Sequence, residues 1–151
     1  MTTADHPPVS SVVPHEGPMV LLSRIVSHDD EETICQADPE ALALFRSGDR
    51  VGSWVGIELM AQCIAAHAGM HAHRRGEVPR IGFLLGSRRV DIHQAWMQGT
   101  LGVRAQRNWG DESGLVSFDC ALWEEPAGTP VASGRLNCFL PSDSELKEMP
   151  R

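Results

Sequence analysis

The feature that most constrains the fold is a proline-free segment from Ser53 to His73, rich in alanine, methionine, leucine and isoleucine. Its length and composition predict a helix, and no other segment of the chain predicts a long one. Apolar side chains occupy nearly the whole circumference of its helical wheel. Because a helix of this kind must be buried on most of its sides, we expect the rest of the chain to wrap around it.

The segments on either side of this helix predict strands. Before it, Met19–Ser27 and Glu32–Ala37 read as two strands joined by an acidic turn, and Pro39–Arg46 reads as a short helix. After it, glycine, aspartate and proline separate five further strand-like segments: Arg80–Leu85, Ser87–Ile92, Thr100–Asn108, Gly114–Glu124 and Pro130–Leu140. This order predicts an α+β fold, in which an antiparallel sheet of about five to six strands wraps around one long central helix.

A chain of 151 residues suits a single domain. We expect the domain to span residues 13–140, between an N-terminal tail at 1–12 and a C-terminal tail at 141–151. The four cysteines are widely spaced and stand among apolar neighbours. This spacing predicts reduced core residues rather than disulfides or a metal site.

The charge and hydropathy of the chain narrow the classes of partner. A formal net charge of −7 disfavours general binding to nucleic acid, which depends on neutralising phosphates. No apolar run approaches the roughly 20 residues that cross a bilayer, so we expect no membrane partner. The N-terminus is polar and lacks the apolar core of a signal peptide, which makes the cytoplasm the expected location.

One stretch of the chain is basic. Residues 74–107 carry seven arginines against two acidic residues, a local charge of +5. Such a stretch in an acidic chain could dock an anionic partner. The alternative is that these arginines occupy solvated strand and loop positions, and the sequence alone leaves both interpretations open.

The carboxylate of Glu58 stands out near the start of the apolar helix, and Gln62 lies one turn further along the same stripe. Glu58 could occupy an exposed first turn and stabilise the helix dipole. It could instead line a pocket as an acid–base group. Gln62 could then orient Glu58 or bind a substrate carbonyl, and backbone amides around Gly56 could donate to a thioester oxygen.

Two histidines near the end of the helix form a second polar pattern. His67 and His71 are spaced i, i+4, which would suit a pair of metal ligands. No carboxylate accompanies them in the sequence, and a cation near a helix C-terminus also suits the dipole. We therefore expect no metal site and no cofactor.

Three motifs carry a family resemblance. Pro14–Ile25 looks like an opening PHxxPMLLLDRV, Gly56–Gln62 like a helical E-x-(M/L)-A-Q, and Gly82–Gly86 like an FLLG strand. In this order they resemble the 3-hydroxyacyl-acyl carrier protein dehydratases of the hotdog fold, and within these the dehydratase-like proteins found with aryl polyene pigment biosynthesis. The resemblance spans nearly the whole chain. It implies a hotdog fold that forms dimers, with the active sites at the dimer interface.

The resemblance also implies a mechanism. In these dehydratases a histidine removes the α-proton of a 3-hydroxyacyl thioester on acyl carrier protein, and a glutamate or aspartate helps the 3-hydroxyl leave as water. Glu58 takes the carboxylate position, with Gln62 as its helix neighbour. Val55 and Gly56 are then the amide donors to the thioester carbonyl, and Gly86 is the family glycine near the substrate.

One element of the family pattern is missing. The catalytic histidine of the HFPG motif is replaced by Leu44, and no histidine lies between Phe45 and Trp54. We take His15 as the candidate catalytic histidine, because the opening motif runs close to the helix start in the family fold. Asp49 is a weaker candidate.

The resemblance thus predicts a dehydratase-like protein that eliminates water from 3-hydroxyacyl thioesters in fatty-acid or polyene-type synthesis. Two alternatives remain: an acyl thioesterase of the same fold, or a non-catalytic partner subunit of another hotdog dehydratase. The missing histidine favours the second alternative. The implied partners are acyl carrier protein and either a second copy of the chain or a second hotdog dehydratase. From the basic stretch we expect the acidic carrier protein to dock at Arg88 and Arg89.

Overall fold

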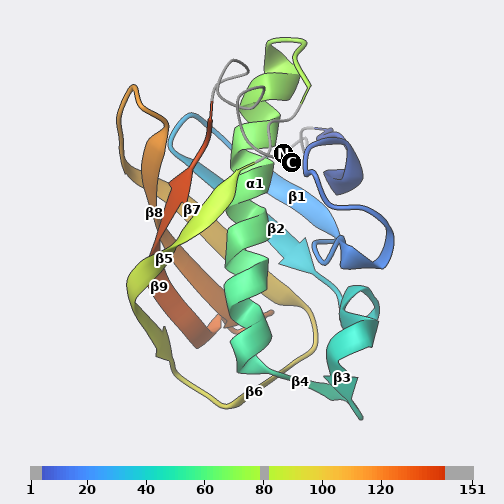
Figure 1. Cartoon of the computed structure of the whole chain (residues 1–151). Coiled ribbons are helices and arrows are strands. Elements are labelled where there is room, and N and C mark those ends of the chain that lie inside the picture. The colour runs from blue at the N-terminus through green and yellow to red at the C-terminus, as the bar shows by residue number, and fades with distance from the viewer. Residues whose placement is uncertain (1–4, 79–81, 142–151) are drawn as a thin grey trace.

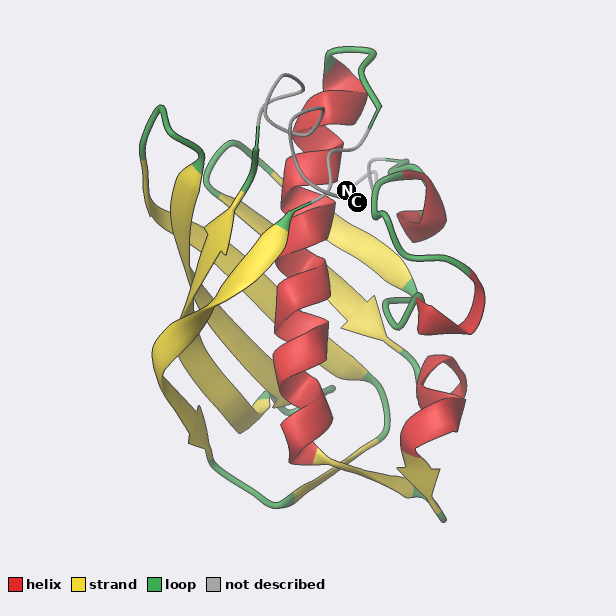
Figure 2. Ribbon diagram, in the orientation of Figure 1, coloured by secondary structure: helices red, strands yellow, loops and turns green. Residues whose placement is uncertain are grey.

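The computed structural model describes residues 5–78 and 82–141, and in it one long helix lies across a strongly curved sheet (Figure 1). Helix α1 spans Gly56–Arg74 and follows directly on a 3₁₀ turn at Ser53–Val55. The predicted helix is therefore confirmed, with its first turn wound more tightly than expected. Its apolar circumference is explained by burial against the sheet on one side and the N-terminal segment on another (Figure 2).

The main sheet has six antiparallel strands in the order β1-β2-β7-β8-β9-β5. These strands are β1 Arg24–His28, β2 Glu32–Ala37, β5 Phe83–Ile92, β7 Leu101–Gly110, β8 Leu115–Glu124 and β9 Thr129–Phe139. Beside the start of α1 lies a small second sheet of β3 Arg46–Ser47, β4 Arg50–Gly52 and β6 Trp96–Gln98. The α+β prediction is confirmed, while the three short strands of the second sheet, β3, β4 and β6, were not expected.

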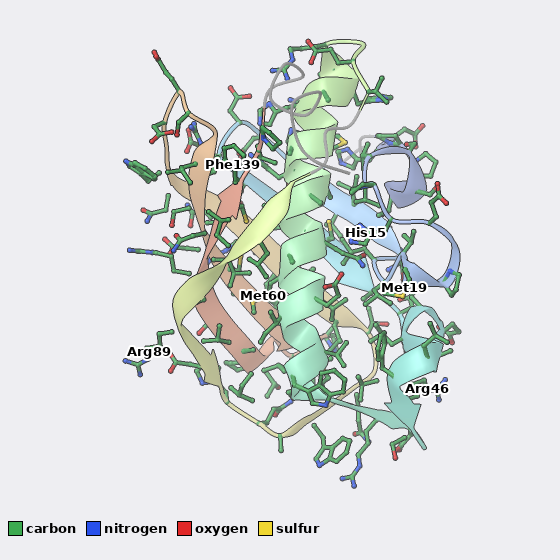
Figure 3. The ribbon with its side chains drawn as sticks, viewed as in Figure 1. His15, Met19, Arg46, Met60, Arg89 and Phe139 are labelled. Atoms are coloured by element: carbon green, nitrogen blue, oxygen red, sulfur yellow. The ribbon has the colours of Figure 1, made fainter. Side chains whose placement is uncertain are left out.

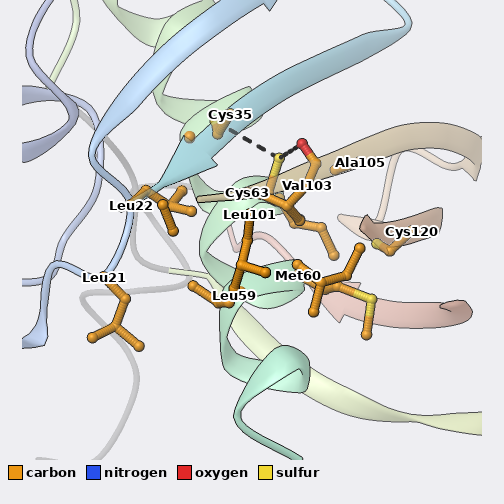
Figure 4. Close-up of a cluster of buried hydrophobic side chains, with 14 of the residues drawn as sticks. Leu21, Leu22, Cys35, Leu59, Met60, Cys63, Leu101, Val103, Ala105 and Cys120 are labelled. Atoms are coloured by element: carbon orange, nitrogen blue, oxygen red, sulfur yellow. Dashed lines mark hydrogen bonds between the residues drawn. The ribbon is translucent and has the colours of Figure 1, made fainter. Parts of the chain in front are cut away.

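The core lies between α1 and the sheet. Burial alternates along β2, with Thr33, Cys35 and Ala37 turned inward. Cys63 of α1 meets this face, with its Sγ 3.8 Å from Cys35 Sγ and 3.7 Å from the Val103 carbonyl oxygen (Figure 4). All four cysteines are free and buried, as predicted. Burial raises the pKa of the Cys120 thiol to about 12, so this thiol stays protonated at neutral pH.

The expected strand Met19–Ser27 is partly wrong. Gly17–Met19 forms a 3₁₀ turn, and β1 begins only at Arg24. The physical reason is a side chain on α1. Gln62 bonds the backbone carbonyl of Met19 and the backbone N–H of Leu21, groups that a strand would pair with its neighbour.

Two further boundaries differ from the expectation. The predicted strands Arg80–Leu85 and Ser87–Ile92 form one strand, β5, because Gly86 lies at a β-bulge and does not end it. Residues 79–81 lie outside the described part of the chain.

The expected N-terminal tail is in part packed. Val9 and Val12 are buried in the core, and a 3₁₀ turn spans Val9–Ser11. Gly69 of α1 permits this, since a Cβ there would lie 1.7 Å from the Val12 carbonyl oxygen. Of the expected C-terminal tail, residues 142–151 lie outside the described ranges. Within those ranges, no helix has the length and apolarity needed to cross a membrane.

Candidate active site

A narrow groove of about 170 Å³ runs along one face of α1 from Glu58. Three alanines of the helix, Ala61, Ala65 and Ala68, line it together with Glu58, at spacings that place all four on one helical face. Ile64 of α1 also lines it. The remaining wall comes from the N-terminal segment and from the regions around the start of β5 and the end of β9: Pro14, His15, Gly82, Leu84, Cys138 and Leu140. The groove is therefore mostly apolar, with one acidic and one imidazole side chain among its lining residues.

These two polar side chains lie next to each other. His15 Nε2 is 3.4 Å from Glu58 Oε1, although 43 residues separate them in the chain (Figure 3). The side chain of His15 is 26% exposed and that of Glu58 is 42% exposed, so both can be reached from the groove. His15 Nδ1 is buried and has no hydrogen-bond partner among the described residues. The structure thus brings the two predicted catalytic residues together in one groove.

The sequence left two interpretations of Glu58 open, an exposed residue of the first helical turn and a residue that lines a pocket, and its position agrees with each in part. It lies in the first turn of α1 with considerable exposure, and it also lines the groove. A carboxylate here benefits from the helix dipole and remains available to a ligand.

Gln62 holds Glu58 in place. Its amide nitrogen donates to Glu58 Oε1 over 3.2 Å and to the Met19 carbonyl over 2.7 Å, while its oxygen accepts from the Leu21 N–H over 3.0 Å. The side chain is completely buried. Both donor groups of the amide are thus engaged within the protein, and this geometry supports the orienting role over the predicted contact with a substrate carbonyl.

The start of the helix offers one of the two predicted amide donors. The Gly56 N–H already donates to backbone carbonyls of the preceding 3₁₀ turn, at Ser53 and Trp54, and is not available to a thioester. Gly56 instead permits close packing, since a Cβ there would lie 2.6 Å from Leu122 Cδ2. Val55 belongs to the first turn, where amides have no partner inside the helix, and so its N–H stays the candidate donor.

The other predicted site residues lie apart from this groove. Gly86 occupies a β-bulge of β5 with φ of 151° and is not among the described residues that line the groove. Leu44, which stands at the family histidine position, is 62% exposed. Asp49 lies in the exposed turn between β3 and β4. Neither lines the groove in the part of the chain described.

The described arginines of the basic stretch are spread over several elements. Arg74 ends α1, Arg89 lies on β5, and Arg104 and Arg107 lie on β7, which β8 and β9 separate from β5. Arg89 is 80% exposed and pairs with Asp91, with 2.8 Å between Nε and Oδ1. The side chain of Arg88 lies outside what the structure describes.

Sequence reasoning missed the apolar wall of the groove. Ala61, Ala65 and Ala68 carry a signal that could have revealed it, because small residues at this spacing leave a channel beside a helix. No comparable sequence pattern predicts the opposite wall, because Cys138 and Leu140, which form it, are far from the helix in the sequence.

Comparisons with known proteins agree on one family. A model of the ApeP-like family, described as ApeP dehydratase, matches residues 7–150. A solved structure described as the dehydratase heterocomplex ApeI:P from Xenorhabdus doucetiae contains a chain with 32% identity and a TM-score of 0.84. The match covers 95% of this chain and 97% of that one. None of the curated proteins matches the sequence.

More distant structures share the fold. A hypothetical thioesterase with coenzyme A from Streptococcus pneumoniae has 11% identity and a TM-score of 0.61, with 79% of this chain and 85% of that one covered. A putative esterase from Mycobacterium tuberculosis has 11% identity and a TM-score of 0.58, with coverage of 78% and 89%. Together with the sheet and helix described above, these matches confirm the hotdog fold.

Proposed function

Because this chain belongs to the ApeP-like dehydratase family, we propose that it takes part in eliminating water from 3-hydroxyacyl thioesters carried on acyl carrier protein during polyene synthesis. The observation that carries the proposal is the His15–Glu58 pair in the apolar groove. An acyl chain suits the apolar lining of the groove, and an acid–base pair suits the reacting end of that chain.

The geometry permits one residue to act as the base and the other as the acid. His15 removes the α-proton of the thioester, and the electrons of that C–H bond form the new double bond. Glu58 donates a proton to the 3-hydroxyl, and the C–O bond breaks to release water. The proton that is removed lies on the α-carbon, and the oxygen that is protonated is attached to the adjacent β-carbon, so a base and an acid 3.4 Å apart can reach both sites. The Val55 N–H would polarise the thioester carbonyl.

A second hotdog dehydratase is the proposed partner. The outer edge of β5, ten residues long, pairs with no strand in the described part of the chain. Leu84, Leu85 and Ile92 of this strand are 46%, 59% and 45% exposed, which leaves an apolar edge open to association. The similar chain from Xenorhabdus doucetiae is described as part of a heterocomplex. A homodimer would cover the same edge, so the partner must be tested directly.

The four buried, free cysteines suit a reducing compartment, and we propose that the protein is located in the cytoplasm.

The first test incubates the full chain with a 3-hydroxyacyl carrier protein, with and without a second hotdog dehydratase, and follows the acyl group by mass. We expect loss of water in the mixture at a rate at least about tenfold above the sum of the separate proteins, because Leu44 replaces the family histidine. Equal rates with and without the partner would contradict the heterocomplex. Release of free carrier-protein thiol without loss of water would identify a thioesterase and overturn the dehydratase.

Carrier-protein docking is proposed at Arg88 and Arg89, on the edge strand. Charge reversal by Arg89→Glu is expected to raise KM for the carrier-protein substrate about three- to tenfold, since this exposed cation would meet an acidic carrier, and to leave KM for a small pantetheine thioester unchanged. Arg46→Glu is the matched control, because Arg46 is exposed and lies on the opposite side of the molecule (Figure 3). Gel filtration checks that the complex still forms. Equal effects on both substrates would contradict docking at this site.

A further inference from the structure

Three histidines from two elements meet at the far end of α1 from Glu58. His28 ends β1, and His67 and His71 lie one turn apart on the helix. Their ring centroids lie 4.7 to 5.1 Å apart, and one ring nitrogen of each lies within 4.8 Å of the other two. His67 Nε2 and His71 Nε2 are 3.3 Å apart. The sequence offered only the helical pair, and the fold adds the third imidazole.

A buried hydroxyl fixes two of these rings. Thr33 Oγ1 lies 2.6 Å from His28 Nδ1 and 2.8 Å from His67 Nδ1, and Thr33 is completely buried. Both Nδ1 atoms are therefore occupied, which leaves each Nε2 for other contacts. His28 Nε2 is buried and has no hydrogen-bond partner among the described residues. Buried polar atoms nearly always have a hydrogen-bond partner, so a nitrogen without one beside two other imidazoles points to a ligand.

Two imidazoles of the cluster, those of His28 and His67, lie in surroundings that disfavour their protonated forms. Burial is the main cause that lowers the pKa of His67 to about 3 and the pKa of His28 to about 4. Neighbouring groups add to the effect, with Arg74 acting on the pKa of His28, and the imidazoles of His71 and His28 on the pKa of His67. A neutral imidazole keeps the nitrogen lone pair that a metal ion requires.

The separation of the two helical imidazoles matches a tetrahedral metal site. Zn²⁺ binds imidazole nitrogen at about 2.0–2.1 Å, which places two ligand nitrogens of a tetrahedron about 3.3 Å apart. The pair on the helix already has this separation. A ring nitrogen of His28 lies within 4.8 Å of the other two, and movement of this ring toward them would complete the third vertex. With the metal on Nε2, both Nδ1–H groups donate to the two lone pairs of Thr33 Oγ1, the kind of outer contact that orients histidine ligands.

We propose that His28, His67 and His71 bind a divalent transition-metal ion of the Zn²⁺ class through their Nε2 atoms. The fourth position would be held by water, because His67 and His71 line a cavity of about 420 Å³. The other walls of that cavity include Arg75, Arg107, Phe118 and Leu140. This site is separate from the His15–Glu58 groove, although Ala68 and Leu140 line both hollows.

The experiment measures metal binding by the full chain after treatment with a chelator. Titration with Zn²⁺ in a calorimeter is expected to show one site per chain, and Co²⁺ is expected to give the visible absorption of a tetrahedral complex. Excess Zn²⁺ is expected to raise Tm by several degrees, because the ion binds the folded chain. His71→Gln should weaken Zn²⁺ binding at least about 100-fold and abolish the Tm shift, and this half-buried residue tolerates the change.

Two further variants decide between a metal site and a merely structural cluster. His73→Gln removes an exposed histidine of the same helix and should leave Zn²⁺ affinity unchanged. Thr33→Val keeps the shape of the buried side chain and should weaken binding about 10- to 100-fold. Absence of binding by the unmodified chain, or equal losses in His71→Gln and His73→Gln, would overturn the proposal. These readouts do not depend on dehydratase activity, so either proposal can fail alone.

Discussion

Glu58→Gln is expected to lower kcat for water elimination by the assembled complex about 10²- to 10⁴-fold. The substitution removes the ionisable proton that the leaving hydroxyl requires, and general acid–base groups contribute about this factor. We expect the substitution to leave the fold and its stability nearly unchanged. Gln62 can still donate to the new amide oxygen, and the side chain at position 58 is 42% exposed, so no buried charge is stranded.

The measurement is the initial rate of water loss by mass, together with Tm of the chain and gel filtration of the complex. Glu16→Gln is the matched control, since Glu16 is exposed in the same opening segment and does not line the groove. Full activity of Glu58→Gln in the mixture would show that the partner supplies the catalysis. The chain would then be the non-catalytic subunit.

The helix and most strands could be predicted because their patterns are local. The segment Ser53–His73 is apolar on nearly every side, and only a helix surrounded by other elements satisfies it. The failure at Met19–Ser27 has the opposite cause. There the side chain of Gln62, which is 41 residues from Leu21 in the chain, bonds the backbone groups that a strand would use. The local sequence pattern cannot predict a contact between residues so far apart.

The same difference between local patterns and long-range contacts decides which parts of the candidate site could be predicted. The helical wheel placed Glu58 and Gln62 on one stripe, and their bond confirms that placement. The resemblance of the opening motif led to His15, which the fold brings to Glu58. The sequence did not show that helical winding begins at Ser53, which is why the Gly56 N–H is already bonded to backbone carbonyls. The sequence did not connect His28 with His67, since only the packing of β1 against the end of α1 brings the two rings together.

His15→Gln is expected to lower kcat of the complex about 10²- to 10³-fold, with KM changed less than threefold, because the amide cannot accept the α-proton. A purely structural role would give a different result. His15 would then act by holding the opening segment, and its loss would lower Tm or raise KM while kcat stayed near its original value. His93→Gln is the control, because His93 is exposed and does not line the groove.

The double variant decides whether the two residues work as a pair. If His15 and Glu58 act in the same elimination step, the double variant should be no more than about threefold slower than Glu58→Gln alone, since groups that act as a unit lose activity non-additively. Multiplication of the two single losses would contradict a shared step. It would indicate independent roles, and the 3.4 Å approach of Nε2 to Oε1 would then be a contact of the resting site only.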